Sequence, residues 1–293
     1  MVNGFLNLYK PSGITSMEAV RQIKKPLGRI KVGHCGTLDP LAEGVLPIAI
    51  GTASRIVEYV LHESKTYKAR IQLGQTTNTY DSEGIVTNTQ PTSHITSQLI
   101  QDTLKNYLGN IRQVPPIFSS LKRQGKPLYK YAREGQQIAI EPREVIIHNI
   151  DLLAVTNPYI DLRVECGAGT YIRSLAHDLG NSLGCGGHLS ALIREESSGF
   201  NIADTVSLAT LTKNITQSPE DILKYLLPID APIKYIPKLG VTHLNALALG
   251  HGRPIPAHHH QEWDSRSPLR RAYNPTSTFI SIIEFNDSNG SWK

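Results

Sequence analysis

Alternating and contiguous runs of apolar residues predict several strands. Residues 67–73 and 160–166 carry apolar side chains at every second position, which is typical of half-buried strands. Residues 45–50 form a continuous apolar run between two glycines and predict a buried strand. Residues 4–10 alternate more loosely and end at a Pro-Ser-Gly turn, which predicts a first strand that stops there.

Apolar residues at helical spacing separate these strands. Ser16 and Thr170 are the predicted N-caps of two helices, and Pro26 is expected to end the first of them. Arg173 then falls in the first turn of a helix, where a positive side chain opposes the helix dipole and indicates a partner such as an acid. The predicted helices cover about residues 16–25, 53–61, 96–108 and 171–179.

Prolines recur between residues 226 and 240 and predict a linker. Short apolar pieces follow, among which residues 279–285 are the best strand candidate. We therefore expect a large domain over residues 1–230 and a small one over residues 231–293, whose abrupt end indicates truncation.

The composition is that of an ordinary globular protein. Of the 293 residues, 40% are hydrophobic and 19% charged, and no run of eighteen apolar residues occurs. The first ten residues lack the basic lead and apolar core of a signal peptide. Cys35, Cys166 and Cys185 have no paired spacing, which argues for a reducing compartment. We expect a cytoplasmic protein with no membrane contact.

One segment carries the basic character of the chain. Residues 112–143 hold seven basic and two acidic side chains, a local charge of +5 that equals the net charge of the whole chain. Phe118, Tyr129 and Tyr131 are interleaved with them, and prolines with Gly125 indicate a loop. Cations for phosphates combined with flat rings for bases are typical of a surface that grips looped RNA. A solvated surface loop is the alternative.

A second segment places one carboxylate on a stiffened loop. Glycines at 33, 36 and 44 bracket Asp39, and Pro40 moves it out of the helical region. The buried strand at residues 45–50 anchors the loop. These residues alone leave two interpretations open, a turn-forming aspartate and a reactive one.

The residues His34-Cys35-Gly36-Thr37-Leu38-Asp39-Pro40-Leu41-Ala42-Glu43-Gly44-Val45-Leu46-Pro47 closely resemble the signature loop of bacterial tRNA pseudouridine synthases. That family isomerises the T-loop uridine at tRNA position 55. The resemblance implies the same activity here, with tRNA as partner and an accompanying tRNA-folding role. Two positions differ from the family pattern. Cys35 stands where Thr or Ala is usual, and Glu43 stands where Thr is usual, which puts the local contacts of the loop in doubt.

The resemblance also implies roles for individual residues. Asp39 is the expected nucleophile, Arg173 its partner, and Tyr67 a stacking group and general base beside the target uridine. Further substrate contacts are expected at His34, Tyr171, Leu192, Lys10 and Asp81. A structural turn is the favoured interpretation of Lys10, and a lone histidine such as His34 is more often structural.

The segment 119–129 resembles the flexible thumb of the same family, which closes on the tRNA stem-loop. Lys122, Arg123, Lys126 and Lys130 are the expected RNA contacts. The implied fold is α+β, with a mixed, largely antiparallel central sheet flanked by helices and loops. A small PUA-like β-barrel at the C-terminus and a monomeric state are also expected.

The implied reaction breaks the N1–C1′ bond of uridine and rejoins the base through C5. It consumes no electrons, water or phosphate, so no cofactor and no metal is expected. Three alternatives compete with this interpretation. They are a Ser-x-x-Lys enzyme through Ser119 and Lys122, a metal site at His258, His259, His260 and Glu262, and a non-enzymatic RNA-binding protein.

Overall fold

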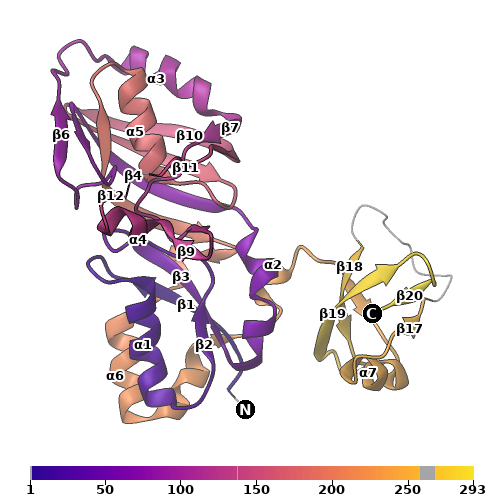
Figure 1. Ribbon diagram of the computed structural model, residues 1–293. Coiled ribbons are helices and arrows are strands. Elements are labelled where there is room, and N and C mark those ends of the chain that lie inside the picture. The colour runs from indigo at the N-terminus through magenta and orange to yellow at the C-terminus, as the bar shows by residue number, and fades with distance from the viewer. Residues whose placement is uncertain (1, 137, 258–267) are drawn as a thin grey trace.

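The computed structural model describes residues 2–136, 138–257 and 268–293, which form a large domain and a small C-terminal one (Figure 1). The large domain is built on an eleven-stranded sheet. Its strands are β1 (Gly4–Lys10), β2 (Val32–His34), β3 (Glu43–Ile50), β4 (Lys65–Leu73), β7 (Gly109–Gln113), β10 (Arg143–Thr156), β11 (Tyr159–Cys166), β12 (Gly187–Ser197), β13 (Phe200–Asn201), β14 (Val206–Ser207) and β15 (Leu226–Leu227).

The main path of this sheet runs β14-β1-β3-β12-β4-β11-β10-β7. Only the β1–β14 and β3–β12 pairs are parallel, so the expected mixed, largely antiparallel sheet is confirmed. Strand β4 shows the expected alternation of buried and exposed side chains. A separate hairpin of β5 (Gln75–Thr77) and β6 (Val86–Thr89) encloses the polar loop around Asp81.

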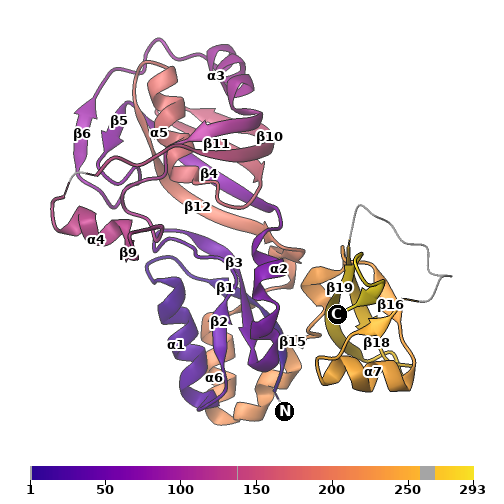
Figure 2. The same ribbon diagram turned by 45° about the vertical axis from the view of Figure 1, so that its right-hand side comes forward.

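Helices cover the sheet at two places (Figure 2). Near β1 and β3, α1 (Ser16–Leu27) packs beside α6 (Leu208–Gln217). Near β12, β4 and β10, α5 (Ile172–Ser182) packs with α3 (Ser97–Leu104). The main apolar core lies between these helices and the sheet. The remaining helices of the large domain are α2 (Val57–Leu61), α4 (Leu128–Arg133), η1 (Gly51–Arg55), η2 (Lys105–Tyr107), η3 (Ile202–Asp204) and η4 (Pro219–Tyr225).

Three predicted helix boundaries are wrong. Thr15, not Ser16, caps α1, because Thr15 and Glu18 form a reciprocal capping box. The same helix continues through Pro26 to Leu27. Thr170 does not cap α5, since its hydroxyl donates to the Gly167 carbonyl and the N-cap is the next residue.

Three predicted segments are more broken than expected. Residues 53–61 divide into the end of η1 and α2, and residues 96–108 divide into α3 and η2. The segment 112–143 is not all loop, because it contains a tight hairpin of β8 (Lys122–Arg123) and β9 (Lys126–Pro127), followed by α4. Its tip is Gly125, whose φ of 80° suits a glycine.

The small domain holds a five-stranded sheet in the order β16-β18-β19-β20-β17, which curls into a half-barrel. The strands are β16 (Lys238–Gly240), β17 (Ile255–Pro256), β18 (Leu269–Tyr273), β19 (Phe279–Asn286) and β20 (Ser291–Trp292), covered by α7 (His243–Gly250). The strand expected at 279–285 is thus confirmed, as is the α+β class. The division at residue 230 remains a prediction.

A short helix, η5 (Ala231–Ile233), leads from the large domain to the small one. Ile233 and Ile236 pack in one apolar cluster with Phe5 and Val60 of the large domain. The Tyr235 hydroxyl also donates to the Tyr59 carbonyl at 2.9 Å. None of the helices in the described part of the chain combines the length and the apolar character needed to span a bilayer.

Gly180 lets α5 approach β12 closely, and α5 carries Arg173. A Cβ at Gly180 would overlap the backbone of Gly186 and Gly187. We expect Gly180→Ala to destabilise the fold by about 1–3 kcal/mol, although alanine favours helix, because the strand must move away. The melting temperature should fall by roughly 5 °C in a thermal unfolding experiment.

Gly250 is the matched control, because it also lies in a helix but a Cβ there would meet no heavy atom within 4 Å. Gly250→Ala should leave the melting temperature unchanged or raise it slightly. Equal melting temperatures for the two variants would contradict the close approach of α5 and β12.

Candidate active site

Asp39 lies on the loop between β2 and β3, and hydrogen bonds fix this loop on both sides of it. On one side, the Ser16 hydroxyl donates to the Leu38 carbonyl at 3.0 Å and accepts from the Leu38 N–H at 2.9 Å. On the other side, the Gly13 N–H donates to the Pro40 carbonyl at 2.8 Å. The position of the carboxylate is therefore set by the strand β1–helix α1 connection and not by the loop alone.

Helix α5 brings Arg173 to Asp39, 134 positions away in the sequence. Arg173 Nη2 donates to Asp39 Oδ1 at 3.0 Å, and Arg173 Nε lies 2.9 Å from Asp39 Oδ2. The same guanidinium donates to the carbonyls of Thr79 (3.2 Å) and Phe118 (3.0 Å) and lies 3.3 Å from Asp81 Oδ2. The Arg173 side chain is 4% exposed and that of Asp39 is 32% exposed, so the carboxylate keeps a free edge.

Burial and three charged neighbours act on the pKa of Asp39. Burial raises the pKa above the ordinary value, the Arg173 cation opposes this rise, the nearby charge of Asp81 adds to it, and the Lys10 cation lowers the pKa slightly. Arg173 therefore acts to lower the pKa of Asp39, but desolvation exceeds the attraction of the cation. A carboxylate with a raised pKa is more basic than an exposed one, which favours bond formation once it is ionised.

Tyr67 and Leu192 are both buried and lie on the neighbouring strands β4 and β12. In this antiparallel pair Tyr67 is opposite Arg194 and Leu192 is opposite Ala69, so the four side chains share one face. Burial raises the pKa of the Tyr67 hydroxyl, although the charge of Arg194 opposes the rise. The phenol is thus protonated at neutral pH.

His34 and Tyr171 complete the group. Burial lowers the pKa of His34, and its buried Nδ1 has no hydrogen-bond partner among the residues described. Tyr171 is the N-cap of α5, and its backbone N–H and carbonyl both bond to the Gln113 amide, at 2.8 and 3.0 Å. Burial raises the pKa of the Tyr171 hydroxyl, and the negative charge of Asp39 adds to this rise.

Comparison with known proteins identifies the family. A model described as "TruB family pseudouridylate synthase (N terminal domain)" matches residues 24–172, about half of the chain. A second, described as "tRNA pseudouridylate synthase B C-terminal domain", matches residues 173–234. The chain belongs to the TruB family of pseudouridylate synthases.

Curated relatives agree over nearly the whole length. The chain is 38% identical to the tRNA pseudouridine synthase B of Dehalococcoides mccartyi strain CBDB1, over 99% of this chain and 95% of the relative. It is 40% identical to the enzyme of Clostridium kluyveri, over 96% and 95% of the two chains. It is 41% identical to that of Thiobacillus denitrificans, over 97% and 92%.

Solved structures share the fold as well. A chain in the crystal structure of a Cbf5-Nop10-Gar1 complex superposes with a TM-score of 0.73 at 28% identity, over 96% of this chain and 78% of that one. A chain in an H/ACA RNP bound to a substrate RNA containing 2′-deoxyuridine gives a TM-score of 0.72 at 26% identity, with the same coverage.

TruB membership confirms the expected enzyme class, a tRNA pseudouridine synthase, which is an isomerase. It also decides against the non-enzymatic RNA-binding protein and the Ser-x-x-Lys enzyme as alternatives. The histidines considered as a metal site, residues 258–260 with Glu262, lie outside the described residues.

Lys10 and Asp81 are engaged by the protein itself. Lys10 is fully buried, and its Nζ donates to the carbonyls of Pro11, Ile14 and Pro40 at 2.8, 2.7 and 3.3 Å. Burial lowers the pKa of Lys10 to about 8. These contacts fit the structural turn favoured for Lys10 and make it a support of the Asp39 loop.

Asp81 is buried against Arg173 and accepts hydrogen bonds from the Thr79 hydroxyl at 2.5 Å and the Glu83 N–H at 3.1 Å. With its oxygens so occupied, Asp81 acts on Asp39 mainly through Arg173 and through its charge. The direct substrate contact expected of it stays a prediction.

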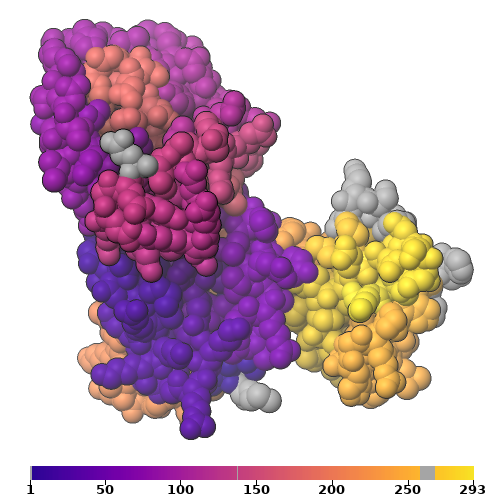
Figure 3. Space-filling model, viewed as in Figure 1, coloured from indigo at the N-terminus to yellow at the C-terminus, as the bar shows by residue number. Residues whose placement is uncertain are grey.

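The thumb residues form the tight hairpin and helix α4, which Figure 3 shows as a magenta lobe on the face that also carries the indigo N-terminal segment. Lys126 lies 2.5 Å from Glu134 and 4.5 Å from the centre of the Tyr131 ring, and Arg123 donates to the Ala139 carbonyl. Lys122 and Lys130 are exposed. Two of the four predicted RNA contacts are therefore engaged within the thumb.

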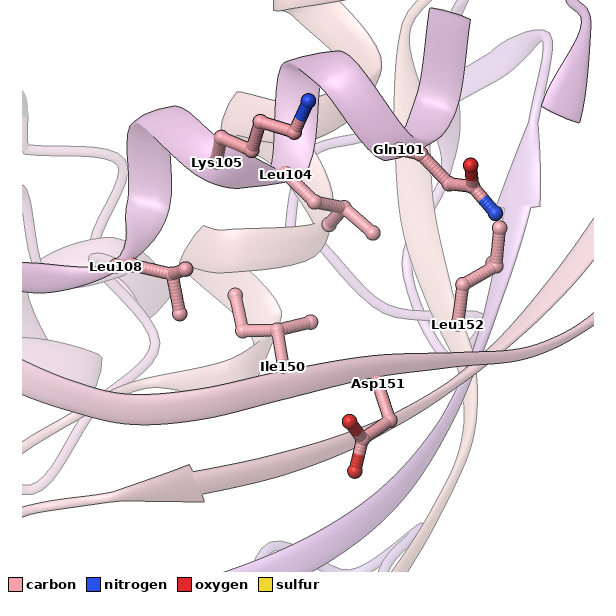
Figure 4. Close-up of a pocket in the computed structure, with 7 residues that line it drawn as sticks. All are labelled: Gln101, Leu104, Lys105, Leu108, Ile150, Asp151 and Leu152. Atoms are coloured by element: carbon pink, nitrogen blue, oxygen red, sulfur yellow. The ribbon is translucent and has the colours of Figure 1, made fainter. Parts of the chain in front are cut away.

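Two residues at the site were missed by the sequence reasoning. Gln113 fixes the backbone of Tyr171, and Arg194 lies buried opposite Tyr67. An arginine in an alternating strand gives no sign of burial, so the local pattern did not indicate Arg194. A small cavity of about 250 Å³ lies apart from the site, between α3 and β10, and none of the predicted site residues lines it (Figure 4).

Proposed function

We propose that this TruB-family enzyme converts uridine 55 in the T-loop of tRNA to pseudouridine, with Asp39 as its nucleophile. The observation that carries the proposal is the geometry of Asp39, a carboxylate paired with a buried guanidinium on one side and about one third exposed on the other. The T-loop position rests on the resemblance of the Asp39 loop to the enzymes that act there.

The reaction breaks the N1–C1′ bond, forms the C5–C1′ bond and moves a proton from C5 to N1, so it needs no net electrons or water. Asp39 acts by attack at C1′, by assisting formation of a glycal, or by addition to C6. All three routes require an ionised Asp39 carboxylate with one edge free to react. Arg173 binds the other edge of the carboxylate and so leaves this edge free.

The uridine must leave the loop before it reacts, because stacking hides its C1′ and C5. Tyr67 stacks on the everted base, Leu192 lines its pocket, and Tyr171 contacts it near Asp39. His34, neutral because its pKa is lowered, contacts the base or fills the space that the base vacates. The T-arm stem is gripped by the thumb. We infer a monomer in the cytoplasm, where the three free thiols stay reduced.

Asp39→Asn should abolish turnover, because an amide is a poor nucleophile. We expect the single-turnover rate on a T-arm stem-loop to fall at least about 10³-fold, with the dissociation constant changed less than threefold. Carbodiimide treatment followed by primer extension measures the pseudouridine formed. Asp161→Asn, which breaks only the surface pair with Arg70, is the control. Turnover by the Asp39→Asn enzyme would rule out Asp39 as the nucleophile.

Asp81→Asn should shift the pH dependence of the reaction. The like charge of Asp81 helps to raise the pKa of Asp39, so removing it lowers that pKa. Because the rate requires ionised Asp39, the acid limb of the single-turnover profile should move to lower pH. Asp178→Asn, a half-buried carboxyl that is absent from the charges acting on Asp39, should leave the limb in place. If the acid limb of Asp81→Asn stays in place or moves to higher pH, the rate does not depend on an Asp39 whose pKa is raised by Asp81.

The two exposed thumb lysines should carry part of the salt dependence of tRNA binding. We expect the double variant Lys122→Gln, Lys130→Gln to reduce the slope of log affinity against log salt by about 1.4–1.8, since each lost phosphate contact removes about 0.7–0.9. The control pair Lys105→Gln, Lys224→Gln removes exposed lysines from other elements and should not alter the slope. An unchanged slope in the thumb variant would show that these lysines do not contact phosphate.

A further inference from the structure

Arg194 on β12 is among the largest side chains buried in the protein. It is only 1% exposed, and no carboxylate pairs with it among the described residues. A cation without an acidic partner is costly to bury, and apolar residues of similar volume often replace such groups without loss of stability. A buried arginine that stability alone does not require calls for another explanation.

The contacts of Arg194 lie at the two ends of the Asp39 loop. Its Nε donates to the Val45 carbonyl at 2.7 Å, and its Nη2 donates to the Gly36 carbonyl at 3.3 Å. Gly36 precedes Asp39 by three residues, and Val45 follows it by six. One guanidinium therefore spans the loop that carries the proposed nucleophile.

The backbone of Arg194 supports the same loop. Arg194 is the register partner of Gly44 in the two-residue parallel contact between β12 and β3. Gly44 has a φ of 103°, and a Cβ there would overlap the Arg194 carbonyl. The end of the loop is thus seated directly on Arg194, and a glycine is needed for that approach.

Arg194 also faces Tyr67, its register partner on β4. The two side chains lie on the same face of the sheet, and the charge of Arg194 opposes the rise in the pKa of the Tyr67 hydroxyl. A single side chain thereby connects the loop of Asp39 with the residue proposed to stack on the uridine. The strand pairing alone, or the loop hydrogen bonds alone, would not fix the position of the Asp39 loop relative to Tyr67.

We propose that Arg194 is a positioning residue, which holds the Asp39 loop and Tyr67 in the relative positions that the reaction requires. This inference rests on the proposed roles of Asp39 and Tyr67. Arg194 does not touch the substrate, and it acts through the carbonyls of Gly36 and Val45 and through its position opposite Tyr67 on β4. Small displacements of a reacting group are enough to reduce a rate about 100-fold.

The test compares Arg194→Met and Arg194→Lys with the wild-type enzyme. Methionine fills similar space without a charge, and lysine keeps the charge but lacks the fork that reaches two carbonyls. The control is Arg163→Lys on strand β11, which is separated from β12 by β4, and where the side chain is half exposed and pairs with Glu195. Melting temperature, dissociation constant for a T-arm stem-loop and single-turnover rate at saturating RNA are measured for each.

We expect both Arg194 variants to lose about 10- to 100-fold in saturated rate, with the dissociation constant within threefold of wild type. Arg194→Met should melt within about 5 °C of wild type, because it buries no charge. Arg163→Lys should match wild type throughout.

A folded Arg194→Met or Arg194→Lys enzyme with a rate within twofold of wild type overturns the inference, as does failure of both variants to fold, which would make Arg194 only structural. Failure of the proposed function looks different, since Asp39→Asn would then stay active or the wild-type enzyme would leave the T-arm unmodified.

Discussion

The candidate active site depends on one buried guanidinium. Arg173 contacts groups from three separate segments of the chain, the Asp39 loop, the loop of residues 79–81 and the Phe118 carbonyl before the thumb. Burying this charge is costly, and it is offset only because two carboxylates and two carbonyls surround it. Loss of any one segment would leave the buried guanidinium with fewer partners, so the segments are held together as a unit.

This arrangement explains how Asp39 can be both basic and ionised. Burial and Asp81 raise its pKa, which makes the carboxylate a better electron donor, while Arg173 limits the rise and orients it. Lys10 and Arg194 add fixed positive charge nearby, and both are bound to backbone carbonyls and not to acids. Lys10 and Arg194 thus hold the Asp39 loop through its backbone, and in the part of the chain that the structure describes neither forms an ion pair with Asp39.

The sequence predicted those features that depend on neighbouring residues. The alternation of β4, the buried strand behind Asp39 and the strand near residue 280 all follow from local patterns. The N-caps at Ser16 and Thr170 were wrong because several residues nearby can cap, and tertiary contacts decide among them. The meeting of Asp39 and Arg173 came from resemblance alone, because no local rule relates residues 134 positions apart. The burial of Arg194 was missed because it depends on how β12 packs between β3 and β4, which no local pattern shows.

The thumb shows why a count of charges does not describe an RNA-binding surface. The net charge of residues 112–143 equals that of the whole chain, yet Arg123 and Lys126 are engaged by Ala139, Glu134 and Tyr131 and stiffen the hairpin. Surface ion pairs of this kind are weak, so RNA phosphates can replace Glu134 as the partner of Lys126 at little cost. In the proposed complex with the T-arm, the RNA would therefore exchange these contacts within the thumb for contacts of its own.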